Sequence, residues 1–418
     1  MSAQILDFPT RPSRLALRLE WFATERSVLL AIWALYFALR VAVLFIDVTP
    51  GSDAEWYYVR AASIAAGKGY LDGAGAPTAL SPPGWPIALG FAFAQFGTSP
   101  VTLGIFNLIS SLLIGLLTLM LGRRLFGSEG AARLGLLLLA VYPNAIGYVP
   151  LALTAVFYTM LLMAGCWAVV ARENRWQMVG AGLIFGFASL VKAQTLLVLP
   201  LLFAIDWLRM KPMGKRLPRL LVDGLVVVAV AMLVVLPWSV RNRVELGHWI
   251  PVSAIGDSSP GVPAADAPMA RNDLGTGWIA AHPDKLLTLA PTKLMGLWLP
   301  EGEAEQAYQA GAPSYARFEG LYRAVHWGNQ IYYGLLMAAF ALAFVVMTVR
   351  RLHDRIRWAG WWLLPYGLAL YATAICLVFS GQSRLHYPFM PFICMAAGWV
   401  AVVTLERLAW RRRRVTLH

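Results

Sequence analysis

Residues 51–86 read GSDAEWYYVRAASIAAGKGYLDGAGAPTALSPPGWP, a polar stretch that follows one apolar run and precedes another. Ser52 and Glu55 form a capping-box pattern, which predicts a short helix that stops at Gly67 or Gly69. The prolines that come next fix an extended path into an apolar helix. The stretch therefore indicates a partly helical loop between two membrane-embedded helices.

The composition of the chain is that of a polytopic membrane protein. Of its 418 residues, 59% are hydrophobic and 14% are charged, and the mean hydropathy is +0.61. These values lie outside the range of soluble globular chains. The cysteines all lie inside apolar runs, so they supply neither a disulfide framework nor a CxxC metal site. They are Cys166, Cys376 and Cys394.

Apolar runs of the length that a bilayer requires, roughly 20 residues per helix, recur along the chain. They predict an all-α polytopic membrane fold of about ten spans, in a single domain over residues 1–405 with a basic cytoplasmic tail at 406–418. The fifth and sixth runs are short and joined by VKAQ, so a count of eight to eleven is expected. The ten runs cover residues 28–47, 100–121, 131–149, 152–171, 177–191, 193–208, 220–238, 330–349, 359–379 and 387–405.

The basic residues predict the orientation of these spans. With the N-terminus in the cytoplasm, the cytoplasmic segments hold 23 Lys and Arg and the outside segments hold 11, as the positive-inside rule requires. The two long loops, 48–99 and 239–329, then lie outside. The net charge of +13 is distributed as short clusters beside apolar spans, which topology and lipid contact explain without nucleic acid. No cytoplasmic connection carries a nucleotide-binding fingerprint, so any chemistry faces outward without ATP.

Several segments resemble a known family in their order and placement. After the first span come SDAEWYYVRAASIAAGKGY and PTALSPPGWPIALGFAFAQFG, then a span that ends LGRRLFG. Further along are FGFASLVKAQTLLVLPLL, LPWSVRNRVELGHWIPVSAIG, HPDKLLTLAPTKLMGLWLP and SRLHYPFMPFICMAAG. Over residues 28–405 this order resembles the GT-C superfamily of integral-membrane glycosyltransferases. The similar branch uses polyprenyl-phosphate sugars and includes protein O-mannosyltransferases and lipid A aminoarabinose transferase.

The resemblance implies a GT-C-like helix bundle with partly helical outside loops. It also implies an inverting glycosyltransferase that moves a hexosyl or pentosyl group from an undecaprenyl-phosphate-type donor. The acceptor would be an envelope lipid, glycan or protein, as in lipopolysaccharide or glycan biosynthesis. Such an enzyme lies in the bacterial inner membrane, with its active site facing the periplasm or exterior.

The resemblance also places a catalytic aspartate in the first outside loop, and by position this role falls on Asp53, with Glu55 as a second carboxylate. Attack of an acceptor hydroxyl on the anomeric carbon needs a base, and Asp53 is the candidate. The alternative for Asp53 is helix-end electrostatics, because a helix N-terminus favours an ionised carboxylate. The chain departs from relatives at Ala155, where an acid is common, and at Lys192, where an arginine is common.

Four basic residues at predicted outside ends of spans are candidates for binding the donor phosphate. Fixed cations near the membrane surface stabilise a leaving phosphate more strongly than exposed cations in water do. Such positions also oppose the positive-inside trend, which favours a function. The alternative is snorkelling of these side chains to lipid headgroups. The four residues are Lys192, Arg241, Arg243 and Arg384.

One histidine and several aromatic residues are candidates for contacts with the substrate. His386 can hydrogen-bond a phosphate or a sugar, whereas a lone interfacial histidine is more often structural. Tyr57, Tyr58 and Trp85 can stack on a sugar ring, whereas aromatic residues at a membrane interface are usually belt residues.

The sequence also bears on cofactors and on two competing functions. No cofactor is required, and the alternative is a divalent cation at Asp53 and Glu55, for which one i, i+2 pair offers few oxygen ligands. A transporter or lipid flippase is the competing function, yet polar residues concentrate in the outside loops and no inverted repeat is visible. A structural subunit of an envelope-assembly complex, the third class, would depend on no loop carboxylate.

Overall fold

The computed structural model describes residues 13–209, 213–254, 283–299, 301–354, 359–378 and 382–415. Apart from an isolated bridge between Leu71 and Pro77, this part of the chain contains no strand, so the predicted all-α class is confirmed. The α-helices are α1 Arg14–Thr24, α2 Arg26–Val43, α3 Asp53–Ala65, α4 Gly84–Phe96, α5 Pro100–Phe126, α6 Glu129–Ala140, α7 Pro143–Gly147, α8 Ala155–Val170, α9 Trp176–Val191, α10 Val198–Arg209, α11 Met213–Leu246, α14 Pro283–Trp298, α15 Glu303–Gly311, α16 Ser314–Arg317, α17 Glu319–His353, α18 Leu364–Val378 and α19 Met390–Val415.

Six helical segments in the described residues are long and apolar enough to cross a membrane. They are Arg26–Val43, Pro100–Phe126, Leu217–Leu246, Glu319–His353, Trp361–Val378 and Ser383–Ala409. Helices α8 and α9 are apolar but only 16 residues long, and α6 and α10 have 12 residues each. The membrane class is therefore confirmed, whereas the predicted count of about ten spans is not.

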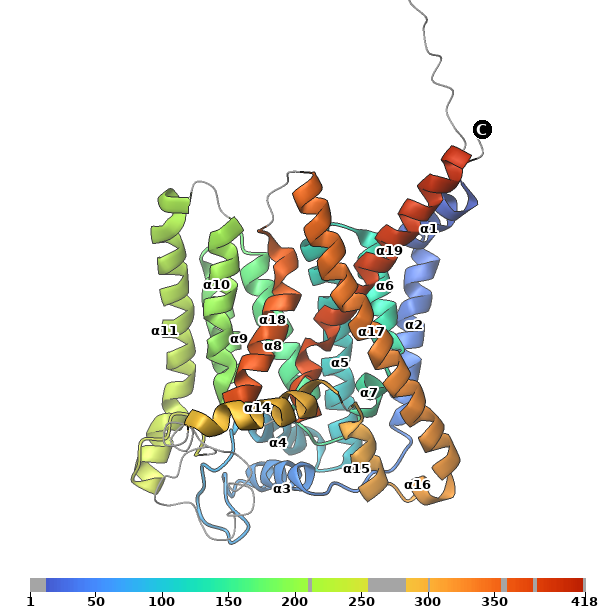
Figure 1. Cartoon of the computed structure of the whole chain (residues 1–418). Helices are drawn as coiled ribbons and strands as arrows, with labels where there is room; N and C mark the ends of the chain where they lie inside the picture. Colours follow the sequence, from blue (N-terminus) through green and yellow to red (C-terminus); the bar gives the residue numbers. More distant parts are fainter. Residues whose placement is uncertain are drawn as a thin grey trace, which may run out of the picture.

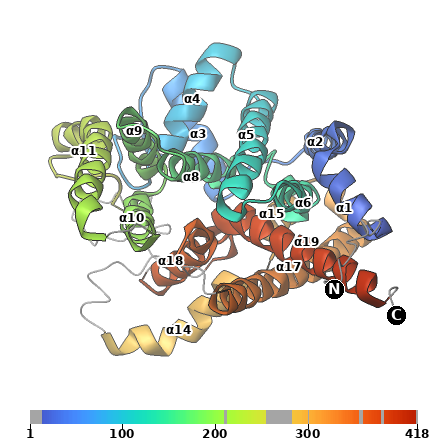
Figure 2. The same ribbon diagram turned by 90° about the horizontal axis from the view of Figure 1, so that it is seen from above.

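The helical bundle has two distinct ends. Figure 1 shows α3, α14, α15 and α16 at one end, called the loop end here, and α1 with the C-terminal part of α19 at the other. Both long loops therefore contribute to the same end, although residues 255–282 of the second loop lie outside the described part. In the view of Figure 2, α19 lies in the middle of the bundle, where it packs against α6 and α17.

The predicted third span, 131–149, is interrupted in the structure. Helix α6 ends at Ala140, and the short helix α7 begins at Pro143. The fully buried Arg40 of α2 donates hydrogen bonds to the carbonyls of Leu139 (3.0 Å) and Ala140 (3.1 Å). Carbonyls at a helix C-terminus lack partners within the helix, so this guanidinium stabilises the interruption.

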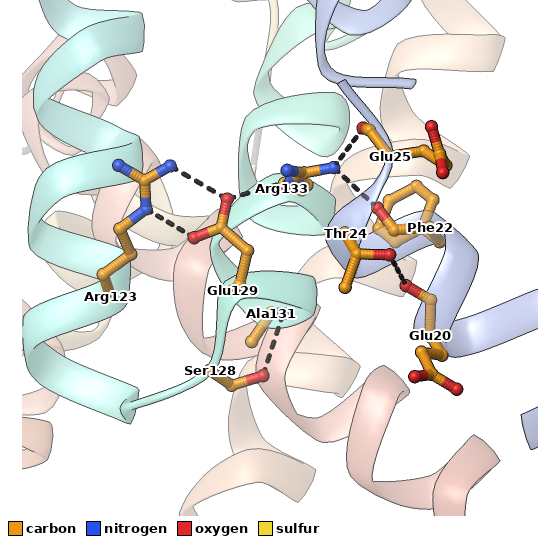
Figure 3. A network of polar contacts seen from close by, with 9 residues as sticks. All are labelled: Glu20, Phe22, Thr24, Glu25, Arg123, Ser128, Glu129, Ala131 and Arg133. Carbon is orange, nitrogen blue, oxygen red and sulfur yellow. Dashed lines mark hydrogen bonds and ion pairs between the residues drawn. The ribbon is translucent and has the colours of Figure 1, made fainter. Parts of the chain in front are cut away.

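An ion-pair network ties helices together at the end opposite the loops (Figure 3). Glu129 accepts from Arg123 at 2.5 Å and from Arg133 at 2.9 Å. Arg133 also donates to the backbone carbonyls of Phe22 (3.0 Å) and Glu25 (2.7 Å), where α1 meets α2. Some of the basic residues that predict the orientation therefore hold helix junctions together.

The first long loop contains the predicted helix, although it begins differently. Helix α3 covers Asp53–Ala65, and Gly67 and Gly69 follow it with φ values of 72° and 89°. The predicted capping box is wrong, because Ser52 has a φ of 53° and its side chain makes no hydrogen bond to the helix. Glu55 is exposed. At the other terminus, α19 continues through Val415, so 406–415 extends the last helix, while 416–418 lies outside the described residues.

Candidate functional site

An ion pair joins two of the candidate residues, which lie far apart in the sequence. Asp53 is the first residue of α3, and Arg384 lies in the short 3₁₀ helix Ser383–Leu385 that precedes α19. The Arg384 Nη1 donates to Asp53 Oδ2, and its Nε donates to Gln382 Oε1 at 2.8 Å. The fold therefore places a predicted base beside a predicted phosphate-binding cation.

A second carboxylate, which the sequence did not single out, completes this group. Glu303 is the first residue of α15, and its Oε1 lies 3.7 Å from Arg384 Nε. Its Oε2 accepts a hydrogen bond from the Ser383 hydroxyl at 3.2 Å. The side chains of Asp53 and Glu303 are each 23% exposed, so a ligand can reach both while most of their surface is desolvated.

These charged groups line a cavity of about 350 Å³ at the loop end. Its walls come from the segment before α3, from the segment 150–153 and from one face of α15. Ligand pockets typically have a few polar groups that converge among apolar walls. The lining residues are Val48, Thr49, Pro50, Gly51, Ser52, Asp53, Ala54, Pro150, Leu151, Ala152, Leu153, Glu303, Gln306, Ala307, Ala310, Gly311 and Arg384.

Lys192 lies where α9 ends and is electrostatically coupled to the same group. The pKa of its ammonium is lowered to about 7, mainly by desolvation and further by the positive charge of Arg384, against a smaller opposing effect of Glu303. Its Nζ lies 5.2 Å from the centroid of the Tyr158 ring. Lys192 does not line the cavity itself, so it supplies a nearby second cation.

His386 belongs to a buried network that holds the site together from behind. Its Nδ1 donates to the carbonyl of Leu297 at 2.5 Å, and its Nε2 lies 2.6 Å from Glu301 Oε2. Tyr142 and Asn144 donate to the other carboxylate oxygen of Glu301. Both His386 and Glu301 have fully buried side chains. The structural interpretation of His386 therefore fits better than direct contact with a substrate.

The linker between α14 and α15 places two acids in different surroundings. Glu301 points into the buried network and Glu303 lines the cavity, with Gly302 between them. Gly302 has a φ of 132°, a conformation that residues with a side chain rarely adopt. The segment that precedes α19 supplies the partners of both acids. Arg384 contacts Glu303, and His386 contacts Glu301. Two acid–base pairs therefore join the linker before α15 to the segment before α19.

The two remaining basic candidates are not part of the cavity. Arg241 donates to the carbonyls of Thr78 (2.7 Å) and Tyr70 (3.0 Å), so it holds the first long loop against α11. Arg243 is exposed and donates to the carbonyl of Gly247 in its own segment. Local contacts explain both side chains, and nothing in the described residues brings them to Asp53.

The predicted second carboxylate and the aromatic candidates do not line the cavity. Glu55 is exposed and does not line the cavity with Asp53. Trp85 is fully buried and donates to the carbonyl of Ala152 at 3.1 Å, so the prediction that it stacks on a sugar is wrong. Tyr57 and Tyr58 are half-buried on α3. Tyr57 makes an edge-to-face contact with Trp56, and Tyr58 makes one with Phe93. Tyr57 also interacts electrostatically with Arg384.

A larger cavity, of about 930 Å³, lies along the opposite face of α15. Glu305 lines it and pairs with His326 at 2.6 Å. Most of its other lining residues are apolar or aromatic and come from the end of α2, from α7 and from α17. Helix α15 therefore separates this cavity from the one that contains Asp53.

Sequence comparisons agree with the resemblance. Residues 81–240 match the model of a family described as dolichyl-phosphate-mannose-protein mannosyltransferase. The chain is also similar to undecaprenyl phosphate-alpha-4-amino-4-deoxy-L-arabinose arabinosyl transferase 2 of Pseudomonas fluorescens (strain Pf0-1), with 29% identity over 173 residues. That match covers 40% of this chain and 31% of the relative. It thus spans about a third of the relative's length.

Two solved structures share the fold. The Archaeoglobus fulgidus oligosaccharyltransferase has a TM-score of 0.58 and 17% identity, over 92% of this chain and 50% of that one. ArnT from Cupriavidus metallidurans in the apo state has a TM-score of 0.53 and 17% identity, over 93% of this chain and 62% of that one. The two solved structures show that the chain shares their fold, and the sequence matches show a similarity to glycosyltransferases over part of its length.

Proposed function

We propose that this protein transfers a sugar from an undecaprenyl-phosphate-type donor to an envelope lipid, glycan or protein acceptor. The observation that carries the proposal is the ion pair of Asp53 and Arg384 at the loop-end cavity. It provides a carboxylate and a permanent cation side by side, the two groups that glycosyl transfer from a phosphate requires. The donor class is supported by the names of the similar proteins, which include undecaprenyl phosphate and dolichyl phosphate.

In the proposed reaction, the acceptor hydroxyl attacks the anomeric carbon of the donor. Asp53 takes the hydroxyl proton as the new C–O bond forms, and the bond from the anomeric carbon to the phosphate oxygen breaks. Direct displacement of this kind inverts the anomeric configuration. Arg384 stabilises the negative charge that the departing lipid phosphate gains, in a site where most of the surrounding surface is desolvated. Lys192 adds a second positive charge nearby when it is protonated.

The distribution of charge supports the proposed side of the membrane. Cytoplasmic placement of the basic segments puts the loop end, with its cavity, on the periplasmic or outer face of a bacterial inner membrane. A lipid-linked donor enters laterally from the bilayer, whereas a hydrophilic acceptor enters from the aqueous side. We propose that no metal is needed, because Arg384 already occupies the position of a cation beside Asp53.

The test is transfer by purified protein from short-chain polyprenyl phosphates that carry a hexose or a pentose. Asp53→Asn preserves the size of the side chain but cannot accept the proton. General-base removal commonly lowers a rate by ~10²- to 10⁴-fold. We expect a loss of this order at an unchanged melting temperature, with activity that resists EDTA in the unaltered enzyme.

Glu55→Gln is the matched control, because Glu55 lies on the same helix but is exposed. It is expected to retain most activity. A well-folded Asp53→Asn variant with near-normal turnover would refute the assignment of the base. Equal losses in both variants together with inhibition by EDTA would instead favour a cation held by the two carboxylates. Movement of labelled lipid across vesicles without any transfer would favour a flippase.

A further inference from the structure

We infer that Glu303 and Gln306 form the subsite that binds the hydroxyl groups of the transferred sugar. This inference rests on the proposed function, since it assigns a role within the same cavity. Both residues lie on α15 and line the cavity that contains Asp53 and Arg384. The sequence-based candidate for a second carboxylate, Glu55, does not line it.

The spacing of residues on α15 gives the cavity one continuous helical face. Glu303, Gln306, Ala307 and Ala310 all line the cavity, at positions i, i+3, i+4 and i+7 of the helix. The first two present a carboxylate and an amide, which are hydrogen-bonding groups suited to neighbouring hydroxyls. The two alanines leave space in front of the helix. A polar edge beside small residues is suited to a compact polyhydroxylated ring.

Glu303 has hydrogen-bonding capacity that its present contacts do not fill. An ionised carboxylate offers about four acceptor positions. Oε2 accepts one hydrogen bond from Ser383. Oε1 lies 3.7 Å from Arg384 Nε, which is beyond hydrogen-bonding distance.

The other charged groups of the cavity are committed to different parts of the donor. Asp53 pairs with Arg384 and, as the proposed base, faces the acceptor hydroxyl. Arg384 faces the phosphate. The sugar lies between phosphate and acceptor, so the wall next to both groups receives the sugar hydroxyls. Glu303 lies on that wall, because it is close to Arg384 and lines the same cavity as Asp53.

Binding measurements separate this role from a purely structural one. The full-length protein is titrated with a short-chain polyprenyl phosphate, and then with the same lipid that carries a hexose or a pentose. The Kd for the bare lipid divided by the Kd for the sugar-bearing lipid reports the contribution of the sugar to binding. Glu303→Ala is expected to lower this ratio by about 10- to 100-fold, as loss of hydrogen bonds to a charged group predicts. The Kd for the bare polyprenyl phosphate is expected to stay unchanged.

Glu305→Ala is the matched control, because Glu305 lies on the same helix but lines the opposite cavity. Glu305→Ala is expected to leave the Kd ratio unchanged. Gln306→Ala is expected to lower the ratio less than Glu303→Ala does, since a hydrogen bond from a neutral group is weaker. If Glu303 only holds Arg384 in place, Glu303→Ala would weaken both lipids equally, and the inference would be overturned. An unchanged ratio in a variant with a normal melting temperature would overturn it as well.

Deoxy sugars provide a second readout. One sugar hydroxyl should donate a hydrogen bond to Glu303. A deoxy sugar that lacks this hydroxyl should bind the unaltered protein more weakly, but its affinity for Glu303→Ala should equal that of the complete sugar. Additive losses for every deoxy position would overturn the inference. Transfer by the unaltered protein tests the proposed function separately, so that function can hold even where the sugar subsite is refuted.

Discussion

Lys192 has a charge that changes with pH near neutrality, because its pKa is about 7 in the folded protein. In the proposed reaction, its protonated form, which predominates below pH 7, contributes to binding of the donor phosphate. Above pH 7 the side chain loses its charge. We therefore expect the affinity for a polyprenyl phosphate to fall as pH rises from 6 to 9, by up to about tenfold per unit above 7. Titrations at fixed ionic strength measure this dependence.

Lys192→Arg is the control for the pH effect, since an arginine stays charged over this range. The variant is expected to bind with little dependence on pH up to 9. An identical pH slope in the variant and the unaltered protein would show that another group titrates.

Trp85 lies in the core and is fully buried between Phe106 and Phe157, each with a ring centroid 5.5 Å away. Trp85→Ala is expected to reduce the free energy of unfolding by about 3–5 kcal/mol, because it removes a large buried side chain and leaves a cavity. The melting temperature in detergent measures the effect. A fall in sugar affinity at an unchanged melting temperature would contradict the core assignment.

The sequence identified some of the site residues and missed others for physical reasons. The sequence predicts roles for Asp53 and Arg384 separately, and only the fold shows that they lie together. Glu303 was missed because its partner, Arg384, lies far away in the sequence. The two residues come together only when the second long loop packs against the segment before α19. Trp85 was misassigned because an aromatic residue near a predicted interface has the same sequence pattern in a core as in a belt. The roles of Asp53 and Arg384 in catalysis stay predictions.

At the scale of elements, the start of α15 depends on one glycine. Gly302→Ala places a side chain where φ is 132°, and its Cβ would lie 3.3 Å from Glu305 Oε2. Strain of this kind costs about 1–3 kcal/mol. We expect a lower melting temperature and reduced transfer, because Glu301 and Glu303 would no longer reach their separate partners.

Gly320→Ala is the matched control on α17, where a Cβ would have no atom within 4 Å. It is expected to leave stability unchanged or to raise it by up to about 1 kcal/mol, as alanine favours a helix. Equal melting temperatures for Gly302→Ala and the unaltered protein would show that the linker tolerates another conformation.

Helix boundaries were predicted less well than helix positions. The interruption between α6 and α7 in the apolar run 131–149 coincides with Pro143, because a proline disfavours a helical conformation at the residue before it and cannot continue a helix. Arg40, which is distant in sequence, satisfies the carbonyls at the end of α6. A hydropathy pattern describes the composition of a run, but not the partners that its backbone finds.

At the scale of the whole molecule, the orientation in the membrane is the main prediction. Single cysteines at Gly73 and Gly320, both exposed at the loop end, should react with an impermeant thiol reagent in intact spheroplasts. A cysteine at Asn174, exposed between α8 and α9, should react only after permeabilisation. The native cysteines are buried, so background labelling is expected to be low. The opposite labelling pattern would invert the topology and the proposed side of the site.

The architecture of the bundle was predictable because two simple quantities determine it. The lengths of the apolar runs predict where helices cross, and the distribution of Lys and Arg predicts which loops share an end. The structure confirms that α3 and α14 to α16 lie together at one end. The exact number of spans was not predictable, since α6, α8, α9 and α10 are shorter than a bilayer normally requires.

The buried Arg40 has a consequence for biosynthesis. Arg40 lies in the last turn of α2, and a charged side chain in a membrane-embedded helix is costly when it has no partner. Besides the carbonyl of Tyr36 in its own helix, its acceptors are the Ser111 hydroxyl of α5 and the carbonyls at the end of α6, which the ribosome delivers about 70 to 100 residues later. Helix α2 therefore reaches its final position only after α5 and α6 have left the translocon. A chain truncated before α6 should leave its first segment loosely inserted and open to membrane quality-control proteases.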